Sequence, residues 1–154
     1  MWFESDTAYL EILIGGYTDR PWYFKTAHIG VNALSCQASY NSEETGNNFI
    51  MWDEILQTEE IVAIRDGLNA ILSGATNKYV FHSEYETFAI TVWTSSSGFE
   101  AIVQVQNIDG NVKEQFHLER AALVENLEYL NACCEKYPVR DAESCIFEEG
   151  CDEE

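Results

Sequence analysis

Basic residues are scarce in this sequence, where 8 Lys and Arg stand against 27 Asp and Glu among 154 residues. The net charge is −19, and the acidic ending "FEEGCDEE" does not account for it, because residues 1–138 alone hold 20 acids and 7 bases. A phosphate backbone is bound by a face rich in Lys and Arg. The composition therefore argues against direct nucleic-acid binding and favours a basic protein as the partner.

Long apolar runs are also lacking. No stretch approaches the ~20 residues that a membrane span requires, and the start "MWFESDTAYLEILIGG" lacks the features of a secretory signal. Apolar residues still make up 46% of the chain, which is enough to bury a core despite the acidic composition. We expect one domain over residues 1–138, then an acidic, mobile tail over residues 139–154, and a cytoplasmic location.

The cysteines show no C-x-x-C pair, and their number, five, is odd. This usage favours reduced thiols in a cytosolic protein. The sharper alternative is a metal site that combines Cys133 or Cys134 with Cys145 and Cys151, although no histidine lies near them.

Catalytic signatures are absent as well. The sequence contains no glycine-rich phosphate loop, no G-x-S-x-G, no H-E-x-x-H and no calcium-loop spacing. A nucleophile–base pair of Cys36 and His82 is conceivable, but nothing in the sequence brings the two together. We expect a protein that is not an enzyme and that uses no cofactor and no metal.

Two segments have helical periodicity. Thr58 is a suitable N-cap for the first helix, and Gly74 suits its C-terminal cap. Gly67 inside this helix indicates a close approach by another part of the chain. The second helix is expected over residues 120–136, with Pro138 ending it. Each helix has one apolar face, formed by Ile61, Ile64, Leu68, Ile71 and Leu72 in the first and by Leu123, Leu127, Leu130 and Cys134 in the second.

The remaining periodicity is that of strands. Alternation begins at Ala8 and returns in a second region that ends at Tyr40, and "NSEETGNN" has the composition of a loop. A meander follows from "KYVFHS" to "VKEQFHL", with a hairpin signal at Asp109-Gly110-Asn111. We predict an α+β domain with a twisted, mostly antiparallel sheet of about six or more strands and two helices packed on one face.

A partner-binding surface is expected where acids and aromatics adjoin, since aromatic residues dominate interface hot spots. The candidates are an acidic loop, a Trp-Asp pair and the tip of a hairpin: Glu43, Glu44, Trp52, Asp53, Glu84, Tyr85 and Glu86.

The meander "F-x-I-x-V-W…G-F-x-A-x-V-x-V" and the closing segment "QFHLERAALVENLEYLNACCEKYPV" resemble bacterial immunity proteins of polymorphic toxin systems, in particular the WapI-type family. The resemblance covers residues 8–139 as an order of elements and is strongest over residues 116–139. Cys145 and Cys151 depart from the pattern. The resemblance implies a cytosolic inhibitor that binds a toxin, often a nuclease, and blocks its active or substrate-binding surface.

Two alternatives to this function stay open. One is a phage-type acidic protein that mimics nucleic acid and occupies a host defence protein. The other is a small enzyme or ligand-binding domain, which would show a deep pocket with converging polar groups.

Overall fold

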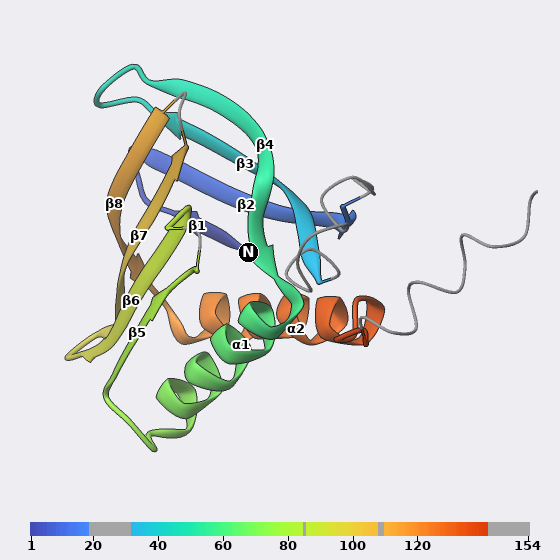
Figure 1. Ribbon diagram of the computed structural model, residues 1–154. Helices are drawn as coiled ribbons and strands as arrows, with labels where there is room; N and C mark the ends of the chain where they lie inside the picture. The colour runs from blue at the N-terminus through green and yellow to red at the C-terminus, as the bar shows by residue number, and fades with distance from the viewer. Residues whose placement is uncertain (19–31, 85, 108–109, 142–154) are drawn as a thin grey trace, which may run out of the picture.

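The computed structural model describes residues 1–18, 32–84, 86–107 and 110–141, apart from the side chains of residues 52–55 and 107. Two helices and eight strands occur in these ranges (Figure 1). The order is β1 (Trp2–Glu4), β2 (Ala8–Tyr17), β3 (Ala33–Ser42), β4 (Asn48–Gln57), α1 (Thr58–Ser73), β5 (Lys78–His82), β6 (Phe88–Ser95), β7 (Gly98–Asn107), β8 (Gly110–Leu118) and α2 (Arg120–Lys136). No helix of these ranges is long and apolar enough to cross a membrane.

The strands form two antiparallel meanders of four strands each. Sheet A has the order β1-β2-β3-β4 and sheet B the order β5-β6-β7-β8. In Figure 1 sheet A crosses the top of the molecule, sheet B stands on the left, and the two helices lie below. The predicted α+β class, the antiparallel pairing and the two helices are confirmed. The strands divide between two sheets, which the alternation of single strands does not reveal.

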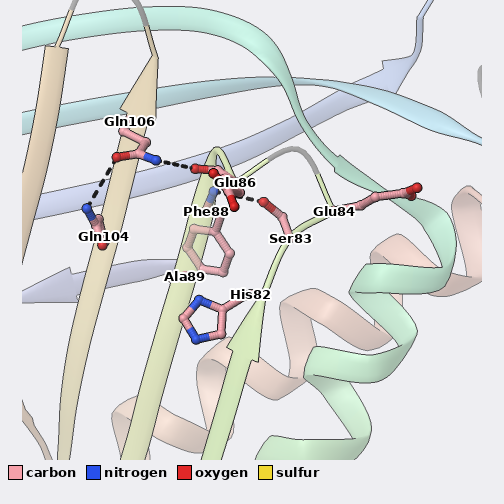
Figure 2. Close-up of a pocket in the computed structure, with 8 residues that line it drawn as sticks. All are labelled: His82, Ser83, Glu84, Glu86, Phe88, Ala89, Gln104 and Gln106. Atoms are coloured by element: carbon pink, nitrogen blue, oxygen red, sulfur yellow. Dashed lines mark hydrogen bonds between the residues drawn. The ribbon is translucent and has the colours of Figure 1, made fainter.

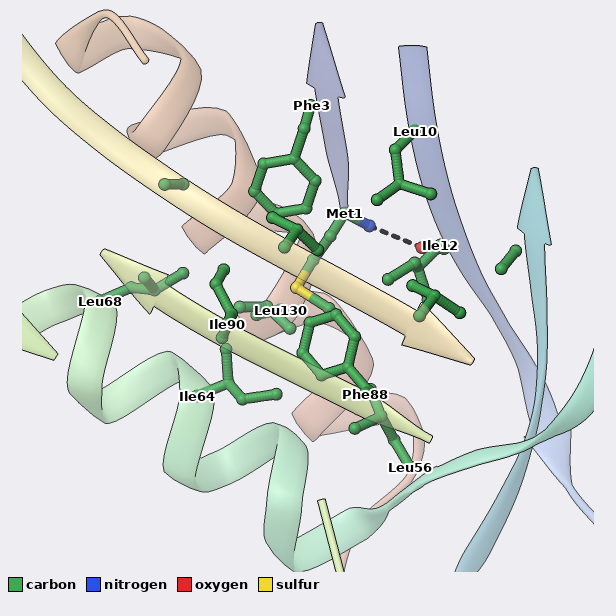
Figure 3. Packing of buried hydrophobic residues seen from close by; sticks show 14 of the residues in the cluster. Met1, Phe3, Leu10, Ile12, Leu56, Ile64, Leu68, Phe88, Ile90 and Leu130 are labelled. Carbon is green, nitrogen blue, oxygen red and sulfur yellow. Dashed lines mark hydrogen bonds between the residues drawn. The ribbon is translucent and has the colours of Figure 1, made fainter. Parts of the chain in front are cut away.

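The core lies between the inner faces of the two sheets and the helices. One continuous cluster of buried side chains joins all these elements (Figure 3). Met1 is fully buried at its centre, and its amine donates a hydrogen bond of 2.7 Å to the Ile12 carbonyl. The sheets meet through the rings of Phe3 and Phe116, whose centroids are 5.7 Å apart. At another point Tyr40 of β3 donates to Glu114 of β8 at 3.0 Å.

Helix α1 begins with a reciprocal cap. Gln57 is the N-cap residue, and its backbone N–H donates to Glu60 Oε1 at 2.9 Å. The predicted N-cap, Thr58, is instead the first helical residue and is fully buried. Gly74 ends the helix in the left-handed conformation, with φ of 77°, as expected.

The close approach expected at Gly67 is made by Tyr79 of β5. A Cβ atom at this glycine would lie 2.2 Å from Cζ of the tyrosine ring, well inside van der Waals contact. The ring is also fixed, because its hydroxyl donates to the Ala63 carbonyl at 3.0 Å. Glycine at this position therefore allows α1 to lie directly on sheet B.

Helix α2 covers an edge of sheet A. Asn126, only 1% exposed, accepts a hydrogen bond from the Trp2 N–H and donates one to the Trp2 carbonyl, both at 2.9 Å. Three residues later, the Tyr129 hydroxyl accepts from the Ile14 N–H at 2.8 Å. These side chains satisfy backbone groups that an edge strand would otherwise leave open to pairing with another chain.

Candidate ligand-binding face

The outer face of sheet B is formed by the side chains that alternate with its buried ones. Inward positions such as Ile90, Val92 and Phe116 are almost fully buried, so the residues between them face away from the core. The outer face comprises Lys78, Val80, His82, Ala89, Thr91, Trp93, Ser95, Glu100, Ile102, Gln104, Gln106, Asn111, Lys113, Gln115 and His117.

This face differs in charge from the rest of the molecule. Among the described residues, it carries two lysines and two histidines but a single acid, Glu100, in a chain of net charge −19. Glu100 lies opposite His117 in the strand register, and its Oε1 is 2.9 Å from the histidine Nδ1. Hydrogen bonding to Glu100 raises the pKa of His117. The one carboxylate of the face is therefore held beside a base.

Trp93 supplies the largest aromatic side chain of the outer face. It is half-buried and lies on β6 between Lys78 of β5 and Glu100 of β7. Cross-strand neighbours on one face of an antiparallel pair have Cβ atoms about 5 Å apart, so the lysine and the tryptophan are neighbours on this face. An aromatic platform next to a cation is suited to stacking with another ring.

Amide side chains dominate the other end of the face. Gln104 Nε2 donates to Gln106 Oε1 at 3.3 Å and to Asn111 Oδ1 at 3.2 Å. Gln106 Nε2 in turn donates to the Glu86 carbonyl at 2.7 Å (Figure 2). These bonds fix the orientation of both glutamines and tie the outer face to the loop that joins β5 to β6.

A hollow of about 280 Å³ lies at this end, lined by His82, Ser83, Glu84, Glu86, Phe88, Ala89, Gln104 and Gln106. Its loop is anchored to the start of α1, where the Glu84 N–H donates to Glu60 Oε2 and Gln57 Nε2 donates to Glu84 Oε2, both at 2.9 Å. Burial raises the pKa of Glu60, and the N–H donors of Glu84 and Gln57 oppose that rise. The Glu84 side chain points towards α1 in Figure 2, away from the hollow.

A second, more open hollow of about 490 Å³ lies on the outer face of sheet A. It is lined by Tyr9, Ser39, Tyr40, Asn41, Asn48, Phe49 and Ile50. Ile50 is 67% exposed, and the Tyr9 hydroxyl donates to Glu11 Oε2 at 2.8 Å. Burial and this carboxylate raise the pKa of Tyr9 to about 12. The hollow has few polar groups that converge on one point.

The structure separates the residues that the sequence suggested for a partner surface. Glu43 and Glu44 are exposed in the turn between β3 and β4, which Figure 1 shows well away from the loop holding Glu84 and Glu86. Trp52 and Asp53 lie on β4, but their side chains are outside the described part of the chain, and so is Tyr85. Of the seven, Glu84 and Glu86 line the hollow at sheet B. Their role as a partner surface stays a prediction.

Two further sites were suggested from the sequence, a Cys36–His82 pair and a cysteine metal site. Cys36 is fully buried in sheet A, whereas His82 is exposed on sheet B, so they do not form a nucleophile–base pair. Cys133 is buried in the core and Cys134 is partly buried, while the positions of Cys145 and Cys151 lie outside the description.

The outer face of sheet B was not predicted, because the net charge of the whole chain conceals the local charge of this face. The signal was present in the alternation of the meander: the outward positions of β6 to β8 are Ala, Thr, Trp, Ser, Ile, Gln, Asn, Lys and His, with one Glu. Assigning each charged residue of these strands to the inward or the outward face would have identified this surface.

Comparisons with known proteins identify structural neighbours only. No family model matches the sequence, and no curated protein matches it. The plant transcriptional regulator PBF-2 aligns with a TM-score of 0.47 and 14% identity, covering 99% of this chain and 94% of its own. WHY3 from Arabidopsis thaliana aligns with a TM-score of 0.44 and 13% identity, covering 89% of this chain and 86% of its own.

These neighbours contradict the predicted function. PBF-2 is described as a transcriptional regulator and not as a toxin inhibitor. The immunity-type function, the basic protein partner and the exclusion of direct nucleic-acid binding are therefore corrected. The physical reason is local, since a net charge of −19 does not describe a face with two lysines, two histidines and one glutamate. At these TM-scores no site or activity is transferred, and the chain's own residues must carry any functional argument.

Proposed function

We propose that this protein binds single-stranded nucleic acid on the outer face of sheet B. The observation that carries the proposal is the composition of that face, which is rich in amides, holds Trp93, and bears two lysines against one paired glutamate. Elsewhere the chain is strongly acidic. A polyanion is repelled by most of this surface and meets least repulsion here.

The chemistry of the face suits bases more than phosphates. Base–aromatic stacking contributes about 1–3 kcal/mol per base and needs no particular sequence, and Trp93 offers such a platform. Glutamine and asparagine side chains provide both donors and acceptors for base edges. Unstacked bases of a single strand can reach them, whereas a duplex presents its base edges only inside grooves.

The electrostatics predict an unusual salt dependence. Each phosphate that a protein neutralises on a single strand contributes about −0.7 to the slope of log K against log salt concentration. With Lys78 and Lys113 as the cations of the face, the slope should be no steeper than about −1.5. Repulsion from the acidic remainder makes it flatter still, because salt screens that repulsion.

The test is a fluorescence-anisotropy titration of a labelled single strand of about 15 nucleotides, which is near the upper end of site sizes known for single-strand binders. Trp93→Ala should weaken binding roughly 5- to 150-fold, whereas Trp93→Phe should retain most of it. Gln104→Ala should also weaken binding. Gln37→Ala, which removes an amide from the outer face of sheet A, is the matched control and should have no effect.

Two results would refute the proposal. One is no saturable binding to any single strand by a folded protein. The other is equal loss of affinity in the Gln104 and Gln37 variants, which would place the nucleic acid elsewhere or show only a general effect on the fold. A duplex of the same sequence should bind more weakly than the single strand.

A further inference from the structure

The hollow at the end of sheet B differs from the rest of the outer face in its hydrogen-bonding character. We infer that it is a subsite for one base, and that it selects guanine among the four by accepting hydrogen bonds from two adjacent donors. This inference rests on the proposed binding of single strands.

The shape of the hollow supports a site for one base. In the strand register His82, Ala89 and Gln104 stand side by side on β5, β6 and β7. The alanine methyl between two longer side chains leaves the space that forms the hollow (Figure 2). Its volume of about 280 Å³ lies just below the roughly 300–1,000 Å³ of pockets for drug-sized ligands, so it suits a single ring system. The His82 ring borders this space and offers a face for stacking.

The directions of the hydrogen bonds around the hollow leave acceptors at its rim. Gln104 Nε2 is engaged by Gln106 and Asn111, and Gln106 Nε2 is engaged by the Glu86 carbonyl. The amide donors of both glutamines are therefore used in bonds to neighbouring protein groups. Gln104 Oε1 points away from Gln106 (Figure 2). Glu86, an exposed residue on the rim, adds a carboxylate, which only accepts hydrogen bonds when ionised.

Hydrogen bonds support the described residues of the rim. Glu86 has φ of 57°, which is uncommon for a residue other than glycine. Its N–H donates to the Ser83 carbonyl at 3.0 Å, and Ser83 Oγ accepts from the Phe88 N–H at 2.9 Å. With the anchoring of Glu84 on α1, these bonds hold the loop against the end of the sheet.

Acceptors at the rim discriminate among bases. Guanine presents an imino N–H and an amino group side by side, and a carboxylate can accept both at once in a bidentate bond. The other three bases pair each donor of that edge with a neighbouring acceptor, which a carboxylate repels. The same carboxylate repels phosphate, so the base and not the backbone enters the hollow.

The experiment compares two single strands by fluorescence anisotropy, a thymine tract and the same tract with one central guanine. The protein should bind the guanine-containing strand more tightly, by roughly 5- to 150-fold for one good bidentate contact. Glu86→Gln should remove most of this preference and leave thymine-tract binding unchanged or tighter. Glu125→Gln, an exposed acid on α2, is the matched control and should keep the preference.

A second variant tests the space itself. Ala89→Phe fills the hollow from its floor, so it should abolish the preference while Trp93 still binds thymine. Equal affinity of the unaltered protein for both strands would overturn the guanine subsite and leave the proposed function standing. Binding of neither strand would overturn both. A preference that persists in the Glu86→Gln and Ala89→Phe variants would show that guanine is read elsewhere.

Discussion

The contact between Gly67 and Tyr79 predicts that Gly67→Ala destabilises the protein when Tyr79 is present and stabilises it when Tyr79 is replaced by alanine. Alanine is about 1 kcal/mol more favourable than glycine in a helix interior. At this position, however, the added Cβ would lie 2.2–2.5 Å from three ring carbons of the tyrosine. The ring cannot swing aside freely, because its hydroxyl is bonded to the Ala63 carbonyl. Overpacking of this kind costs about 1–3 kcal/mol, and the short distance puts it at the upper end.

Gly67→Ala should therefore lower the free energy of unfolding by about 2 kcal/mol in the unaltered protein, once the gain in helix propensity is subtracted. In a Tyr79→Ala background the clash is gone, and the same substitution should raise the free energy of unfolding by about 1 kcal/mol. The coupling energy of the double-mutant cycle is then about 3 kcal/mol.

The assay is urea denaturation of the unaltered protein, the two single variants and the double variant. Unfolding is monitored by circular dichroism at constant temperature and pH. Asn69→Ala is the control, since Asn69 is exposed on the same helix and should give the same small change in both backgrounds. A stabilising Gly67→Ala in the unaltered protein would refute the reasoning. So would a change of the same sign and size in both backgrounds.

Three further predictions concern the core and the covered edge. Asn126→Ala removes both hydrogen bonds to the Trp2 backbone and should cost roughly 2–4 kcal/mol in urea denaturation, whereas Asn131→Ala on the exposed side of α2 should cost under 1 kcal/mol; equal costs would contradict the bridging role. Burial lowers the pKa of the Met1 amine from 8.0 to about 5, so the unfolded chain binds more protons between these values. The free energy of unfolding of a chain that begins at Met1 should then rise from pH 5 to pH 8, by on the order of 4 kcal/mol from this group, and an absence of any rise would exclude the buried neutral amine. Burial also raises the pKa of Cys133, so mass spectrometry should find this thiol unlabelled by an alkylating reagent until the protein unfolds, and rapid labelling of the native protein would show that the core opens there.

Much of the secondary structure was predictable because its periods are local. The alternation from Ala8 to Ile14 and the apolar face of α2 at Leu123, Leu127 and Leu130 both point to the core as expected. Strand β4 was not predicted, because its sequence "NFIMWDEILQ" does not alternate and follows a stretch with loop composition. Strand β1 has three residues, too few to show a period.

The division into two sheets depends on contacts between distant residues. Phe3 meets Phe116, and Tyr40 meets Glu114, across separations that no local pattern records. The N-cap illustrates a finer limit. Thr58 is the better cap by residue type, but Gln57 has the extended backbone and the partner in Glu60, so the reciprocal bond decided the boundary.

The candidate site was not predicted because its local charge differs from the charge of the whole chain. A net charge of −19 is a property of the whole chain, and the outer face of sheet B departs from it because its single acid, Glu100, lies beside His117. Glu84 and Glu86 were predicted as part of a partner surface at a hairpin tip, but their neighbours Gln104 and Gln106 come from strand β7. Only the register of the sheet places them together.

The most direct test of the central claim is an amide and side-chain NMR map of the protein titrated with a short single strand. The Trp93 indole and the side-chain amides of Gln104, Gln106 and Gln115 should shift in a saturable way, while the outer face of sheet A around Gln37 should stay unchanged. Shifts confined to sheet A or to the helices, or no shifts at saturating strand, would contradict binding on the outer face of sheet B.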